Sequence, residues 1–156
     1  MGGQVPTLDG GGVVLDAHPL VAFLEHEPGA RAVAALLTRA TAGEVGLHIT
    51  TVNAGEVMLA IERTRGADAC HDTLDLLQEL PLNIVVADLE LAARAEWFKL
   101  RGGLSYADCF AAALAHRLGA RVLTGDREFE RVTDRVQVLW LDELDDRAPG
   151  DAGGAA

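Results

Sequence analysis

Four carboxylate residues each stand at the edge of an apolar segment of this 156-residue chain. Asp16 ends "VVLD", Glu56 ends "TTVNAGE", Asp108 ends "LSYAD" and Asp126 ends "VLTGD". Carboxylates that meet in one place raise one another's pKa unless a cation neutralises them. An all-oxygen ligand set favours Mg²⁺ or Mn²⁺ over zinc, and such ions support phosphoryl chemistry. The four acids are therefore candidate ligands of one metal centre.

Each acid taken singly also fits a helix cap. "NAGE" places Asn53 at an N-cap and Glu56 at N3, and "SYAD" repeats this pattern with Ser105 and Asp108. Acidic side chains in a first helical turn also interact favourably with the helix macrodipole. Helix capping accounts for the position of any one of these acids. A shared metal ion accounts for the presence of all four at the edges of apolar segments.

The segments that must position these acids alternate between strand and helix. Apolar runs rich in Val, Leu and Ile predict strands at 12–16, 46–50, 82–87, 121–124 and 136–141. Helical spacing predicts helices over 19–26, 29–41, 53–66, 67–79, 88–103 and 105–120, with a short helical turn near 127–131. This alternation predicts an α/β fold, with a mostly parallel sheet of about five strands, helices on both faces, and only the last strand free to run differently. Because ligands bind outside the carboxyl ends of such strands, we expect the four acids on one rim of the sheet.

The composition predicts one domain over 12–141, preceded by a disordered Gly-rich extension at 1–11 and followed by a flexible acidic tail at 142–156. The net charge of −11 argues against broad binding to nucleic acid. The tail holds five of the acids, however, so a local basic rim remains possible. The sequence contains no apolar stretch long enough to span a membrane and no signal-peptide pattern. We therefore expect a cytoplasmic protein with no membrane partner.

Taken together, the four motifs resemble those of the PIN-domain ribonucleases, and most closely the VapC-type toxins of bacterial toxin–antitoxin pairs. The resemblance runs from about Val13 to Leu141 and is carried by "VVLDAHPLVAFL", "TTVNAGEV", "LSYADCFAAALA" and "VLTGDREF". The successive acids are about 40, 50 and 18 residues apart, as in the family. The chain departs from the family at His18, where a small hydroxyl residue is common, and in the residues that precede the first strand.

The resemblance implies a single PIN-like domain and a metal-dependent endoribonuclease that hydrolyses RNA phosphodiester bonds with a metal-activated water. Its catalytic and metal-binding residues would be Asp16, Glu56, Asp108 and Asp126, and its cofactor Mg²⁺ or Mn²⁺. The implied partners are an RNA substrate, a small cognate antitoxin and a second copy of the chain in a homodimer.

Further residues can assist such a site. Ser105, Thr124 and Asn53 lie near the acids, and the hydroxyls of Ser105 and Thr124 can hold metal-bound water. The candidates for contact with RNA phosphates are Arg63, Arg65, Lys99, Arg101 and Arg127. Trp97 and Tyr106 are able to stack on a base or to pack in the core, and the sequence leaves this open.

Two other functions remain as alternatives. A receiver domain or a haloacid-dehalogenase-like phosphatase also places acids at strand ends, but both generally need a lysine near the phosphate. The only lysine, Lys99, lies in a predicted helix, and no D-x-D motif follows the first strand. The second alternative is a non-catalytic PIN module kept for assembly, for which the presence of all four acids gives no support.

Overall fold

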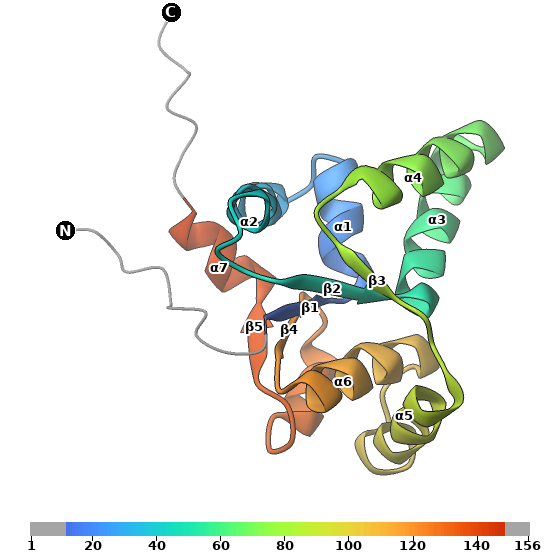
Figure 1. Ribbon diagram of the computed structural model, residues 1–156, viewed down its shortest axis with the longest axis vertical. Helices are drawn as coiled ribbons and strands as arrows, with labels where there is room; N and C mark the ends of the chain where they lie inside the picture. The colour runs from blue at the N-terminus through green and yellow to red at the C-terminus, as the bar shows by residue number, and fades with distance from the viewer. Residues whose placement is uncertain (1–11, 149–156) are drawn as a thin grey trace, which may run out of the picture.

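The fold is a parallel sheet between two layers of helices (Figure 1). The computed structural model describes residues 12–148, and the predictions of flexible ends at 1–11 and 149–156 lie outside the described residues. The strands are β1 (Val13–Leu15), β2 (Leu47–Thr50), β3 (Asn83–Val85), β4 (Arg121–Thr124) and β5 (Val138–Trp140). They are ordered β3-β2-β1-β4-β5, and every neighbouring pair is parallel, the last strand included.

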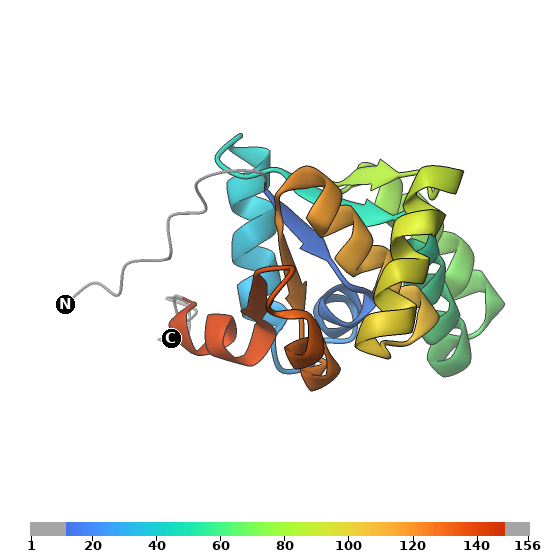
Figure 2. The same ribbon diagram turned by 90° about the horizontal axis from the view of Figure 1, so that it is seen from below.

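Helices cover both faces of this sheet, as the alternating pattern predicts. On one face lie α1 (Ala17–Leu24), α2 (Ala30–Thr41), α3 (Thr51–Arg65) and α4 (Ala67–Glu79). On the other face lie α5 (Leu89–Gly102), α6 (Tyr106–Leu118) and the 3₁₀ helix η1 (Arg127–Val132) (Figure 2). Within the described residues, no helix is both long and apolar enough to cross a bilayer.

The central strand β1 shows why the sheet is buried on both sides. Val13 and Leu15 belong to the apolar cluster under α1, α2 and α3, whereas Val14 belongs to the cluster under α5 and α6. Successive side chains of a strand point to opposite faces, so an unbroken apolar run fits a strand with helices on both sides. Helix α6 packs its alanines against this sheet, and its residues 108–115 are all buried.

The strand order brings the carboxyl ends of β1, β2 and β4 together. The chain leaves β1 toward β2 on one side and later returns to β4 on the other side. In parallel sheets this change of direction opens a crevice beyond the strand ends, where ligands bind. The acids that follow these strands are therefore placed around a common crevice.

Two local predictions were wrong. Helix α3 begins at Thr51 with Thr50 as its N-cap, so Asn53 is not the cap. The predicted flexible tail is also wrong for residues 142–147, which belong to the helix α7 (Leu141–Arg147). This helix lies beside α2, where the Asp145 carboxylate accepts a hydrogen bond from the Ala32 N–H at 3.1 Å. Asp145 thus supplies the cap that Gly29, at the start of α2, cannot provide.

Candidate active site

Three of the predicted acids converge at the strand ends. Asp16, Glu56 and Asp108 each offer a carboxylate oxygen, and these oxygens lie within 4.8 Å of one another. They come from the end of β1, from α3 and from the first turn of α6. Residues separated by up to 92 positions would not meet in this way by helix capping alone, because capping is a local interaction.

Asp16 is fixed by hydrogen bonds on both of its oxygens. Its Oδ1 accepts from the Ala17 N–H at 2.8 Å, and its Oδ2 accepts from the Thr124 hydroxyl at 2.9 Å. Thr124 is fully buried at the end of β4, beside β1. Thr124 therefore contacts the site through Asp16, whose carboxylate its hydroxyl orients.

Glu56 is not part of a capping box. Thr50 Oγ1 accepts from the Asn53 N–H at 3.0 Å and donates to Asn53 Oδ1 at 2.6 Å, so these two residues complete the cap. Glu56 lies one turn further into α3, where no backbone N–H needs a side-chain acceptor. Asn53 also donates from Nδ2 to the Ala107 carbonyl at 3.1 Å, which ties α3 to the start of α6. This bond sets the position of Glu56 relative to Asp108.

Asp108 does occupy the N3 position of a cap, but the cap uses its amide. The Ser105 hydroxyl accepts from the Asp108 N–H at 3.2 Å. Ser105 also lines the pocket that the acids form. Ser105 therefore caps α6 and also lies beside the acids, and the Asp108 carboxyl remains available to the crevice.

Asp126 belongs to a second, overlapping group. Its oxygens, with those of Asp108 and Glu128, also lie within 4.8 Å of one another. Asp126 caps η1 by accepting from the Glu128 N–H at 2.9 Å, and its own N–H donates to Thr124 Oγ1 at 3.0 Å. Glu128 was missed in the sequence, where its only signal is its place two residues after Asp126 in "GDREF".

The electrostatics of the cluster favour a cation. Burial raises the pKa of Asp16 and of Glu56, and the nearby charges of Glu56 and Asp108 respectively raise them further. Burial, followed by the charge of Asp16, raises the pKa of Asp108 to about 7. Asp16 is 3% exposed and Asp108 is 7% exposed, so water screens their repulsion poorly. A divalent cation would offset this repulsion, and the donor set, which is all carboxylate oxygen, fits Mg²⁺ or Mn²⁺.

The acids line an open pocket of about 350 Å³ that also includes His18, Ser105 and Gly125. The His18 ring lies so close to Gly125 that a Cβ at position 125 would be 2.4 Å from His18 Nδ1. A glycine at this position therefore makes room for the imidazole. His18 does not join either group of converging carboxylates.

None of the five basic candidates is among the described residues that line this pocket. Arg65 pairs with Glu25 at 3.1 Å, and Arg127 pairs with Asp142 at 2.8 Å. Lys99 donates to the Leu104 carbonyl at 2.8 Å, which leaves it holding the loop before α6. Arg101 lies over the Trp97 ring, and Arg63 is exposed on α3. A phosphate-binding lysine, which a receiver or phosphatase site would need, is thus not found at the acids.

The carboxylates lie where the strand order of the parallel sheet reverses, beyond the ends of β1 and β4. This arrangement is typical of α/β domains that bind a metal ion there. The chain belongs to the PIN domain family, whose model matches residues 13–135. No curated protein matches the chain.

Solved structures share this fold over most of the chain. A toxin–antitoxin complex from Klebsiella pneumoniae is 16% identical with a TM-score of 0.61, and the match covers 83% of this chain and 97% of that chain. A DNA-bound VapBC from Salmonella typhimurium is 16% identical with a TM-score of 0.64, covering 83% and 98%. VapC20 from Mycobacterium tuberculosis, described as a toxin that cleaves the sarcin-ricin loop, is 17% identical with a TM-score of 0.57, covering 76% and 92%. At sequence identities this low, the comparison shows that these proteins share the fold of this chain.

Proposed function

We propose that this protein is a metal-dependent endoribonuclease. The observation that carries the proposal is the convergence of Asp16, Glu56 and Asp108 within 4.8 Å in a PIN domain. Burial and mutual repulsion raise the pKa of all three, which is costly without a counter-ion. The cluster is therefore suited to binding a metal rather than to maintaining the fold.

The residues of the chain divide the work of such a site. Asp16, Glu56 and Asp108 would hold Mg²⁺ or Mn²⁺, and Asp126 with Glu128 would extend the ligand set from the η1 side. When bound, a divalent ion lowers the pKa of a water and neutralises charge on a phosphate. Thr124 keeps Asp16 oriented through its 2.9 Å hydrogen bond. Asn53 keeps α3 and α6 in register through its 3.1 Å bond to Ala107.

The proposed biological role is that of the toxin in a toxin–antitoxin pair. Support comes from solved complexes of this fold described as toxin–antitoxin or VapBC assemblies, and from the sarcin-ricin loop cleavage attributed to VapC20. RNA is thus the proposed substrate, and a small antitoxin is the proposed partner. A cytoplasmic location and a homodimer complete the proposal, and sedimentation at micromolar concentration tests the latter.

The test is RNA cleavage by the wild type and by Asp16→Asn, each with EDTA, Mg²⁺ or Mn²⁺. The substitution keeps the side-chain shape and removes one negative ligand, so we expect cleavage to fall by more than about 100-fold, beyond the usual effect of losing an outer contact. Cleavage by the variant at the wild-type rate would remove Asp16 from the site.

A further inference from the structure

A group of arginines lies around Trp97, where α5 borders α6 and η1. The Arg101 guanidinium lies 4.8 Å from the centre of the Trp97 ring, and that of Arg135 lies 5.3 Å from it. Arg94 is one turn before Trp97 on α5, and Arg131 projects from η1. We refer to Arg94, Arg101, Arg131 and Arg135 together with Trp97 as the arginine strip. Four of the chain's 13 basic residues thus gather in one place on an otherwise acidic protein.

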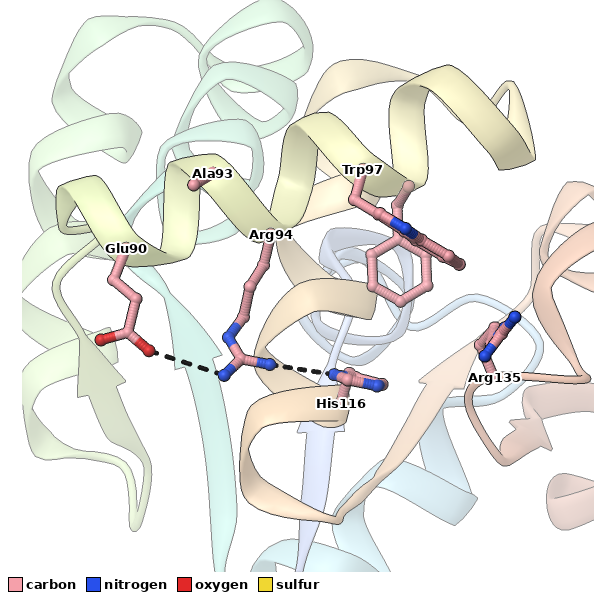
Figure 3. A pocket seen from close by; sticks show the side chains of 7 residues that line it. Glu90, Ala93, Arg94, Trp97, His116 and Arg135 are labelled. Atoms are coloured by element: carbon pink, nitrogen blue, oxygen red, sulfur yellow. Dashed lines mark hydrogen bonds and ion pairs between the residues drawn. The ribbon is translucent and has the colours of Figure 1, made fainter.

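The strip lines two adjoining hollows. The larger, of about 540 Å³, is bounded by α5, by His116 of α6 and by Arg135. Figure 3 shows Arg94 between Glu90 and His116 at one end of this hollow, with Trp97 and Arg135 toward the other end. The smaller hollow, of about 140 Å³, shares Trp97 and Arg135 and continues to Arg101 and Arg131. Because the guanidiniums of Arg101 and Arg135 lie over the Trp97 ring, a base can stack on this ring once an arginine turns from it to a phosphate.

The smaller hollow exists because α5 and η1 approach closely. A Cβ on Gly102 would lie 2.6 Å from a methyl carbon of Val132. The absence of that Cβ allows η1 to pack on the last turn of α5, which places Arg131 beside Gly103. Arg131 donates to the Gly103 carbonyl at 3.3 Å.

The strip is also connected to the carboxylate pocket. Arg131 lies 3.9 Å from Glu128, and Glu128 shares the second acidic group with Asp108 and Asp126. Along α6, His116 is eight residues from Asp108, which corresponds to a rise of about 12 Å. A strand of a few nucleotides can span that length.

The charges of the strip are weakly neutralised within the protein. Arg94, Arg131 and Arg135 lie 3.5, 3.9 and 3.6 Å from Glu90, Glu128 and Asp134 respectively. Pairs of this length at an exposed surface contribute little, so the arginines can exchange these partners for phosphates. Among residues 12–148, the buried Nε of Arg94 has no hydrogen-bond partner.

We infer that the arginine strip binds the single-stranded RNA that flanks the cleaved bond, with one base stacked on Trp97 and the backbone phosphates on the arginines. This inference rests on the proposed ribonuclease function and assigns its substrate a single-stranded flank. Arg94 and Arg135 are thus proposed RNA contacts that the sequence did not suggest. Arg63 and Arg65 belong to α3, on the other face of the sheet, and are not part of the proposed RNA site.

The experiment measures binding of a fluorescein-labelled, mixed-sequence single-stranded RNA in EDTA over a range of salt concentrations. Arg101→Gln/Arg135→Gln should weaken binding about tenfold and reduce the salt slope by about 1.4, at about 0.7 for each lost phosphate contact. Trp97→Leu should weaken binding about tenfold without changing the slope, and Trp97→Phe should restore much of the affinity. The matched control, Arg31→Gln/Arg147→Gln, removes the same charge from α2 and α7 and should bind within about twofold of the wild type.

Equal binding by the strip variants and the control would overturn the inference. Poly-glutamate serves as a competitor: if it displaces the RNA at equal concentration and depends equally on Trp97, the strip binds an acidic protein segment and the RNA assignment is wrong. Cleavage of the same RNA is measured with Mn²⁺. If the protein cleaves the RNA but the strip variants bind it as tightly as the wild type, the inference about the strip is wrong and the nuclease proposal stands. If binding depends on the strip but no RNA is cleaved, the nuclease proposal is wrong and the strip remains an RNA-binding site.

Discussion

Asp108 takes part in the helix cap through its backbone N–H and lies in the crevice with its carboxyl group. Its N–H is used by Ser105, while its carboxyl lies among the oxygens of Asp16 and Glu56. The sequence pattern "SYAD" fits both uses, because a capping box and a metal ligand require the same residue type at the same position. The structure separates the two uses: the N–H serves the cap, while the carboxyl forms no ion pair with a basic side chain of residues 12–148.

This charge predicts a pH dependence of the metal-free protein. The pKa of Asp108 rises from 3.8 to about 7 on folding, so its ionisation costs stability as pH increases. The penalty is absent below about pH 4, where Asp108 is protonated in both states, and it grows until about pH 7. In EDTA, wild type should therefore lose stability relative to Asp108→Asn across this window, by several degrees in melting temperature.

Thermal melts of both proteins from pH 4.5 to 7.5 provide the measurement. Adding Mn²⁺ at pH 7.5 should raise the melting temperature of the wild type and leave Asp108→Asn nearly unchanged. A constant difference between the two proteins across the pH range would mean that Asp108 is not repelled by its neighbours. An equal Mn²⁺ shift in both would place the metal elsewhere.

Thr124 gives a second prediction at the scale of single residues. Thr124→Val keeps the side-chain shape and removes the hydroxyl that donates to Asp16 and accepts from Asp126. We expect RNA cleavage to fall about 10–100-fold, as for other residues that orient a metal ligand. Thr133→Val removes an exposed hydroxyl outside the pocket and is the control for the assay. Unchanged cleavage by Thr124→Val would show that Asp16 needs no support from β4.

The sequence pointed to Asp16, Glu56, Asp108 and Asp126, whose carboxylates the structure brings close together, because each follows an apolar segment that predicts a strand or a helix start. It missed Glu128, since the direction of that side chain depends on the 3₁₀ geometry of η1 and not on any periodic pattern. It also misassigned Asn53, because "TTVN" offers several residues able to cap a helix. The bond from Asn53 to Ala107, 54 residues away, is invisible to local rules.

At the scale of elements, α7 shows what composition conceals. Its residues Leu141–Arg147 are mostly acidic, a pattern that also suits a flexible tail. The helix is held by tertiary contacts: Leu141 is buried with the α1 and α2 core, and Asp145 caps α2. The strands and the other helices were predictable because apolar runs encode the strands and apolar periodicity encodes the helices.

Removing the Asp145 cap should destabilise the fold without affecting the site. Asp145→Ala leaves the Ala32 N–H without its acceptor, so we expect a loss of about 1 kcal/mol in the free energy of unfolding. Asp146→Ala, which changes the same charge on an exposed neighbour, should have little effect. Urea denaturation gives the free energies, and RNA cleavage by both variants should match the wild type. Equal stability of the two variants would mean that α7 docks without the cap.

At the scale of the whole molecule, the negative charge of −11 is unevenly distributed. The carboxylate pocket concentrates acids at the strand ends, while the arginine strip concentrates cations beside α5. Net charge alone argues against nucleic acid as a partner, but the local arrangement of the two regions favours a metal in one and phosphates in the other. An inhibitor that mimics the metal would bind the first region.

The proposed antitoxin is such an inhibitor. An arginine guanidinium can pair bidentately with carboxylates, so a segment that inserts one among Asp16, Glu56 and Asp108 would displace the cation. We expect the neighbouring gene to encode a short protein with a DNA-binding N-terminal part and an amphipathic, Arg-bearing C-terminal part. Its C-terminal peptide should inhibit RNA cleavage, and excess Mg²⁺ should weaken this inhibition. The same peptide with the arginine replaced by glutamine is the control. If the peptide binds tightly and its inhibition is independent of Mg²⁺ concentration, the block is steric and the exchange of arginine for metal is wrong.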